Sequence, residues 1–196
     1  MHNGFVVDTE GEKMSKSLGN VANLLDLLEH YDPRAYRLVL LQSHYRSPVR
    51  VGQDNIDAAV TTLSGLDAFA ARTASVAASS PDAEVMNRFR DFMDDDLDTP
   101  SATALLFDTM RRANAALDAS DASASSLVMA VREIVGAFGL EFKSAADVPA
   151  DIAAKAAALD AARAAKDFAT ADALRAELQG AGWIVETTKA GTTVRR

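Results

Sequence analysis

Between residues 51 and 73, large apolar side chains recur at intervals of three and four residues; they are Ile56, Val60, Leu63, Leu66 and Phe69. Because an α-helix has 3.6 residues per turn, this spacing predicts a long amphipathic helix that must pack against a partner. Alanine is abundant and only 6% of the residues are aromatic, which favours thinly packed helices with small side chains over a sheet-rich fold.

Three more helices are predicted after this one. Ser80-Pro81 and Thr99-Pro100 each place a capping residue before a proline, which is typical of a helix start, and apolar residues follow both. Residues 127–138 form the last apolar stretch, which Gly139 closes. Four helices joined by short loops predict an antiparallel up-and-down bundle.

The beginning of the chain predicts a strand at residues 5–7, a polar loop, a helix over 24–30, and a second helix that starts at Asp32-Pro33. We expect this second helix to continue to Tyr45, where Ser47-Pro48 stops it. The strand has no evident partner, so we expect it to be a sheet edge whose neighbours lie outside the chain.

The end of the chain predicts helices over 152–166 and 168–178, followed by a small hairpin over 183–194. We expect Phe168 to share an apolar stripe with Ala171, Leu174 and Leu178, although an exposed aromatic role stays open. Residues 150–196 would have a small hydrophobic core if they folded alone. We therefore expect them to dock on a surface or to fold partly on binding RNA.

Composition narrows the classes of function. Among its 196 residues the chain has no cysteine, which excludes disulfides and thiolate metal sites. Its three histidines are far apart in the sequence and do not have the spacing of metal ligands. The acidic stretch 91–98 has an ordinary interpretation as a solvated helix end beside a cap. We find no apolar run that could span a membrane and no signal peptide, so we expect a cytoplasmic protein without membrane partners.

The net charge of −8 argues against a general nucleic-acid binder, so any RNA contact must come from local basic patches. Each candidate patch has an alternative interpretation as an ordinary solvated surface. One patch comprises Arg34, Arg37, His44, Arg46 and Arg50, and the other comprises Lys189, Arg195 and Arg196.

The loop after the first strand carries two lysines three residues apart, with two hydroxyls and a methionine: Lys13, Met14, Ser15, Lys16 and Ser17. Lysine binds phosphate as a point charge, and hydroxyls and loop amides add donors, so this cationic arm suits a polyphosphate. On spacing alone, an ordinary solvated loop that binds no ligand is an alternative interpretation.

As a motif, KMSKS resembles the signature loop of class I aminoacyl-tRNA synthetases, and the neighbouring motifs resemble the cysteinyl-tRNA synthetases, from this loop to the carboxy terminus. The motifs are Met1-His2-Asn3-Gly4-Phe5, Leu18-Gly19-Asn20, Tyr31-Asp32-Pro33, Ser43-His44-Tyr45-Arg46-Ser47-Pro48, Phe92-Met93-Asp94-Asp95-Asp96-Leu97-Asp98-Thr99-Pro100 and Gly191-Thr192-Thr193-Val194-Arg195-Arg196.

The resemblance implies ATP-dependent ligation of L-cysteine to cysteine tRNA, with residues 13–17 holding ATP and its magnesium. It makes Lys13 and Lys16 the catalytic residues. It also implies a zinc in the full-length enzyme whose ligands lie outside this chain, and a monomer. Because half of the active site would be missing, we expect no activity from this chain alone.

The resemblance further implies three parts: the end of the catalytic domain with the KMSKS loop and a stem-contact region (1–50), a tRNA-binding helical bundle (51–143) and a small α+β anticodon-binding end (150–196). The family often has an acidic residue where Thr187 stands and a tryptophan where Val194 stands. Base contacts from those two positions are therefore not expected. The implied tRNA-binding residues are Arg46, Arg163, Phe168, Asp172, Arg195 and Arg196.

Two other functions stay open at this point. A cysteine ligase that acts on an amino-sugar would keep the KMSKS loop but would have little use for residues 150–196. A non-catalytic helical module that binds RNA or protein would only imitate the motif, and it would fold as a complete unit with no strand lacking a partner.

Overall fold

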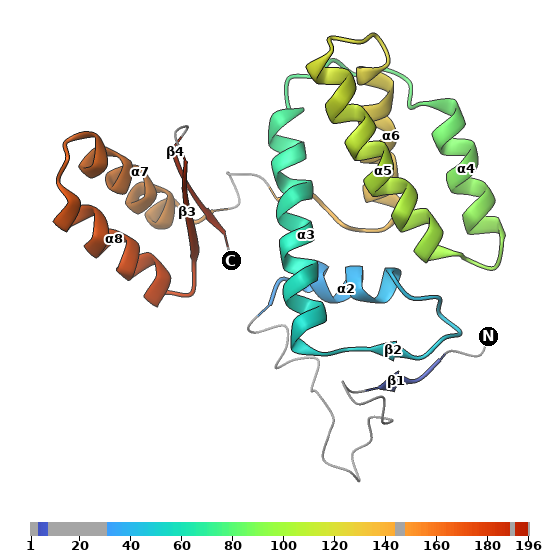
Figure 1. The fold of residues 1–196 in the computed structure, drawn as a ribbon, viewed down its shortest axis with the longest axis horizontal. Coiled ribbons are helices and arrows are strands. Elements are labelled where there is room, and N and C mark those ends of the chain that lie inside the picture. The colour runs from blue at the N-terminus through green and yellow to red at the C-terminus, as the bar shows by residue number, and fades with distance from the viewer. Residues whose placement is uncertain (1–3, 8–30, 144–147, 189–190, 196) are drawn as a thin grey trace. The chain divides into compact units, whose positions relative to one another are not determined.

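The computed structural model describes residues 4–7, 31–143, 148–188 and 191–195. The chain divides into two compact units, Met1–Phe142 and Lys143–Arg196 (Figure 1). The elements of the first unit are β1 (Val6–Val7), α2 (Pro33–Leu41), β2 (Val49–Arg50), α3 (Gln53–Arg72), α4 (Ala83–Asp94), α5 (Thr99–Asp118) and α6 (Ala124–Ala137).

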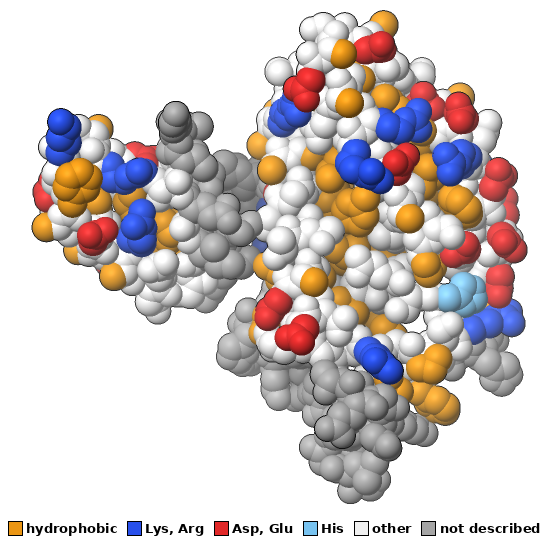
Figure 2. Space-filling view, viewed as in Figure 1, with side chains coloured by type: hydrophobic (Ala, Val, Ile, Leu, Met, Phe, Trp, Pro, Cys, Tyr) orange, Lys and Arg blue, Asp and Glu red, His pale blue; other side chains and the backbone are white. Residues whose placement is uncertain are grey.

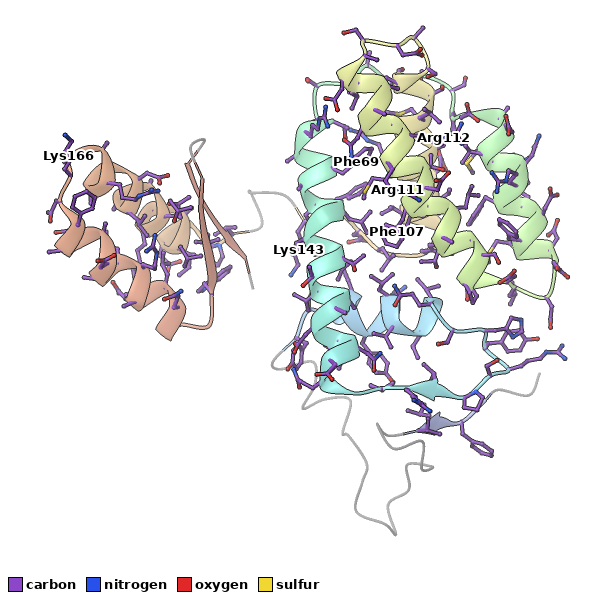
Figure 3. The ribbon with its side chains drawn as sticks, in the orientation of Figure 1. Phe69, Phe107, Arg111, Arg112, Lys143 and Lys166 are labelled. Atoms are coloured by element: carbon purple, nitrogen blue, oxygen red, sulfur yellow. The ribbon has the colours of Figure 1, made fainter. Side chains whose placement is uncertain are left out.

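Helices α3 to α6 run in alternating directions, as the bundle prediction requires (Figure 1). Helix α5 packs on both α4 and α6, and α3 packs on α2. Four of the five periodic residues of α3 are buried in the core, and Val60 is partly buried against it. Phe69 lies among the side chains between α3 and α5 that include Phe107 (Figure 3). The mainly helical fold predicted from the sequence is confirmed.

Four of the described helices have an aspartate as the N-terminal cap: Asp32, Asp82, Asp98 and, in the second unit, Asp167. Asp32 accepts a hydrogen bond from the Arg34 amide at 3.0 Å, as predicted from Asp32-Pro33. The caps of α4 and α5, however, are Asp82 and Asp98, not Ser80 and Thr99. Asp82 accepts from the amide of Val85 at 3.0 Å, and an ionised carboxylate is a stronger acceptor than a hydroxyl at the positive end of a helix.

Several helix boundaries differ from the predictions by a few residues: α7 covers Ala150–Ala164 and not 152–166, for example, and two differences lie in the first unit. Helix α6 begins at Ala124, before Leu127, because small residues extend it by most of a turn. Helix α2 ends at Leu41 and does not reach Tyr45. The residues after it form turns, with the Ser47 amide donating to the His44 carbonyl at 2.8 Å, and Tyr45 is drawn into a tertiary contact instead.

Strand β1 pairs in parallel with β2, so that Val6 lies opposite Val49 and Val7 opposite Arg50. The prediction that the first strand has no partner within the chain was therefore wrong. The Gly4 amide also donates to the Tyr45 carbonyl at 2.7 Å. A Cβ at Gly4 would collide with the Ser47 carbonyl, so this close approach requires glycine.

The second unit contains the predicted helix pair and hairpin: α7 (Ala150–Ala164), α8 (Phe168–Gly180), β3 (Ile184–Thr188) and β4 (Gly191–Arg195). Its core contains Ile152, Leu159 and Leu178, with Trp183 packed against them. Asp160 of α7 accepts from the Thr192 amide at 2.9 Å and from its hydroxyl at 2.6 Å. This contact fastens the hairpin to the helix pair.

Within the residues that the structure describes, no helix combines the length and apolar content needed to cross a lipid bilayer.

Candidate nucleic-acid interface

The proposed ATP-binding residues, Lys13, Met14, Ser15, Lys16 and Ser17, lie outside the described residues, as do the predicted helix over 24–30, Lys189 and Arg196. The backbone of Arg195 belongs to β4. The roles assigned to all of these residues stay predictions. The strand that precedes the loop is described: β1 pairs with β2, and Gly4, just before it, is hydrogen-bonded to the turn after α2.

Arg46 lies in that turn and faces the turn between α4 and α5. Its Nε donates to the Tyr45 hydroxyl at 2.8 Å, and one terminal nitrogen donates to Asp96 at 3.0 Å. The Tyr45 hydroxyl in turn donates to the same Asp96 carboxylate at 2.6 Å. The Arg46 side chain keeps 62% of its surface exposed, so a phosphate could still approach its outer face.

Asp96 stands in the left-handed region with φ of 53°, which aspartate tolerates better than most residues. The hydrogen bond from Tyr45, followed by the charge of Arg46, lowers the pKa of Asp96 below its ordinary value. His44 stacks on Tyr45 with ring centroids 4.8 Å apart, and its Nε2 lies 3.2 Å from the Asp96 carbonyl oxygen. The cluster therefore has a negative charge at its centre, with the Arg46 cation and the His44 ring beside it.

Two arginines of the first predicted basic patch, Arg34 and Arg46, are neutralised by aspartates. Arg34 is buried between Asp32 and Asp67, each 2.8 Å away, and also donates to the Glu141 carbonyl. Burial opposes the charge on Arg34, but the hydrogen bonds that its guanidinium donates to Asp67 and Asp32 outweigh this effect and raise its pKa. Arg34 therefore joins α2 to α3 and is not available to RNA.

The second unit presents an exposed aromatic ring between charges. Phe168, the first residue of α8, has 64% of its surface exposed, so the prediction that it shares the buried stripe was wrong. Lys166 projects from the same turn (Figure 3), and hydrophobic and basic side chains lie together at this end of the unit (Figure 2).

The other two predicted residues of this unit are exposed on its helices: Arg163 in the last turn of α7 and Asp172 in α8. Asp172 lies 3.7 Å from Arg175, whose guanidinium donates to the Thr187 hydroxyl at 3.1 Å. An exposed ring can stack on a base, and neighbouring charged groups can donate to base edges or phosphates. The arrangement is thus chemically suited to single-stranded RNA.

Sequence reasoning missed two arginines in the middle of α5. Arg111 and Arg112 are exposed there (Figure 3), and the nearby face carries several Lys and Arg side chains (Figure 2). Arg111 pairs with Asp108 at 3.0 Å. The adjacent arginine pair indicated an exposed basic surface in the sequence, because arginine is rarely fully buried.

The acidic stretch 91–98 forms helix ends. Asp95 follows α4 and Asp98 caps α5, where its side chain accepts from the Ser101 amide at 3.1 Å. In the part of the chain that the structure describes, no group of three or more histidine or acidic side chains is arranged to hold a metal ion.

Two family models match parts of this chain. The family model for the tRNA synthetases class I (C) catalytic domain matches residues 1–61, and that for the DALR domain matches residues 88–143. Cysteine–tRNA ligases of Shewanella sediminis (strain HAW-EB3), Thioalkalivibrio sulfidiphilus (strain HL-EbGR7) and Halorhodospira halophila (strain DSM 244 / SL1) are 38%, 40% and 41% identical to all of this chain.

The chain is a homologue of the carboxy-terminal part of cysteine–tRNA ligases. It spans 44%, 45% and 44% of the length of those three relatives. The DALR match begins within α4 and includes α5 and α6, so the exposed Arg111 and Arg112 belong to that domain. The catalytic-domain match includes residues 13–17, the turn after α2 and the start of α3.

Proposed function

We propose that this chain supplies the carboxy-terminal part of an enzyme that joins L-cysteine to cysteine tRNA with ATP. The observation that carries the proposal is the similarity to cysteine–tRNA ligases along all of the chain. In this proposal residues 1–50 end the catalytic domain, residues 51–143 form a tRNA-binding bundle and residues 150–196 contact the anticodon.

The chemistry assigned to the KMSKS loop follows from charge. Activation of an amino acid is the attack of its carboxylate on the α-phosphorus of ATP, with pyrophosphate as the leaving group. Negative charge grows on that leaving group, so cations held near it lower the barrier. Lys13 and Lys16 are the proposed cations, with magnesium accompanying ATP, and loop motion brings them to the substrate.

The sites for cysteine recognition are proposed to lie outside this chain. The chain contains no cysteine, and its described residues hold no candidate metal cluster. The residues that the structure describes do not suit a zinc ion, so we propose that any zinc is bound outside them. We therefore expect the isolated chain to bind tRNA without aminoacylating it.

The tRNA is proposed to meet both units. The turn with Arg46 would contact the stem, and the end of the second unit, with Arg163, Phe168 and Asp172, would contact the anticodon. The exposure of Phe168 supports this assignment, because a large exposed apolar ring loses its contact with water on stacking. Arg195 and Arg196 would add charge at the same end.

The test is a binding titration of this chain with cysteine tRNA, an anticodon variant of it and an unrelated tRNA, at one fixed salt concentration. We expect the cysteine tRNA to bind more tightly than the anticodon variant. Equal binding of all three RNAs would leave only a non-specific RNA binder. If no tRNA binds and the full-length protein transfers cysteine to an amino-sugar, the proposal is wrong and the protein is an amino-sugar ligase.

A further inference from the structure

A cleft of about 380 Å³ opens between the end of α2, strand β2 and the first turn of α3. Four of the six residues around it carry polar or basic side chains, and none is acidic. The lining residues are Val39, Gln42, Ser43, Pro48, Arg50 and Asn55.

Arg50 brings a positive charge to this cleft that its surroundings do not neutralise. Across the described ranges, no hydrogen bond or ion pair joins its guanidinium to another group, in contrast to Arg34 and Arg46, which both pair with aspartates. Its backbone is held in the β1–β2 pairing opposite Val7. The charge is therefore exposed, but it projects from a fixed strand.

The lining is chemically suited to one phosphate group. A guanidinium presents paired donors to two phosphate oxygens, and the side chains of Ser43, Gln42 and Asn55 offer further neutral donors. A bound metal cation would need carboxylates, which the lining lacks. With one cation only, the cleft matches the single charge of a phosphodiester better than the several charges of a triphosphate.

We propose that this cleft binds a backbone phosphate of the tRNA and that Arg50 supplies the charge. This inference builds on the proposed function and names a contact within it. In a chain with a net charge of −8, long-range attraction to RNA is weak, so an unpaired cation in a polar cleft carries a large share of the local binding.

The first experiment measures tRNA affinity of the full-length enzyme against salt concentration for the wild type and Arg50→Gln. Loss of one phosphate contact makes the slope of log K against log salt less negative by about 0.7 to 0.9. Arg88→Gln, which removes an exposed arginine on α4 away from the cleft, is measured in parallel to show the effect of one lost charge elsewhere in the first unit. An unchanged slope for Arg50→Gln overturns the proposal.

A second variant, Asn55→Asp, separates binding from folding. Asn55 lies in the first turn of α3, where a carboxylate favours the helix, so the melting temperature should hold or rise while tRNA affinity falls. Asn87→Asp, on α4, gives the same change in net charge outside the cleft and should lower affinity less than Asn55→Asp does. If Asn55→Asp binds tRNA as tightly as the wild type, no phosphate occupies the cleft.

Cysteine-dependent ATP–pyrophosphate exchange identifies the source of the phosphate, because this reaction needs no tRNA. Arg50→Gln should leave the exchange rate and the KM for ATP unchanged. A raised KM for ATP with a wild-type salt slope would assign the cleft to the nucleotide and overturn the proposal. Absence of exchange in the wild-type enzyme would instead reject the proposed function itself.

Discussion

The Tyr45 hydroxyl donates a 2.6 Å hydrogen bond to Asp96, which lies 51 residues further along the chain. Tyr45 belongs to the segment that matches the catalytic domain, and Asp96 to the segment that matches the DALR domain. The Tyr45 carbonyl also accepts from Gly4, in the segment that leads into the KMSKS loop. One residue thus joins the bundle to the strand that precedes that loop.

This contact predicts acid sensitivity. The pKa of Asp96 is lowered in the folded protein, chiefly by the hydrogen bond from Tyr45, so its ionised form stabilises the fold. That contribution is complete above the ordinary pKa of 3.8 and is lost as the pH falls through the lower folded value. Asp96→Asn should therefore melt at a lower temperature than the wild type at pH 7.

The same two proteins should melt at increasingly similar temperatures as the pH falls below about 4, where the wild-type carboxyl also becomes neutral. Asparagine is the right replacement because it tolerates the left-handed backbone at this position. Asp95→Asn, one residue earlier and also exposed, is the matched control. A melting difference that stays constant with pH would exclude the ionised carboxylate as the cause.

Local patterns predicted most of the helices because their causes are local. Ile56, Leu63, Leu66 and Phe69 have the helical period, and the structure buries all four on one face of α3. The exact caps were less predictable. Near Ser80 and Thr99, an aspartate within two residues competes for the same amides and wins through its charge.

The sequence predicted only those site residues that lie in recognisable motifs. The family motifs contain both Tyr45 and Asp96, but their contact arises from tertiary packing and has no sequence period. Phe168 has the correct spacing for the buried stripe, yet it stands at the helix start, where no partner covers it. The Arg50 cleft depends on the pairing of β1 with β2, which the sequence did not indicate.

Arg34→Ala should destabilise the first unit, because it leaves Asp32 and Asp67 without the guanidinium that lies 2.8 Å from each. Removing one partner of a fully buried ion pair costs about 3 to 5 kcal/mol, and the partial exposure of Asp67 reduces our expectation to roughly 2 to 3 kcal/mol. Urea unfolding measures this free energy. Arg72→Ala removes an exposed ion pair with Asp118 and should cost less than about 1 kcal/mol.

Lys16→Ala in the full-length enzyme should lower the rate of cysteine-dependent pyrophosphate exchange by about a hundredfold, the usual effect of removing one charge stabiliser. Lys155→Ala is the control, since Lys155 pairs with Glu177 in the second unit and has no proposed role with ATP. Exchange within twofold of the wild-type rate in Lys16→Ala would remove this lysine from the mechanism.

Phe168→Ala should weaken the binding of cysteine tRNA by about tenfold, because stacking on one base contributes about 1 to 3 kcal/mol. The ring is mostly exposed, so the free energy of unfolding should change by less than about 0.5 kcal/mol. Phe168→Trp should keep or improve affinity, since a larger ring covers more of a base. Leu178→Ala, in the buried core of the same unit, should instead cost about 2 to 5 kcal/mol of stability. If Phe168→Ala lowers stability and leaves tRNA affinity unchanged, the ring has a packing role and the anticodon must be bound elsewhere.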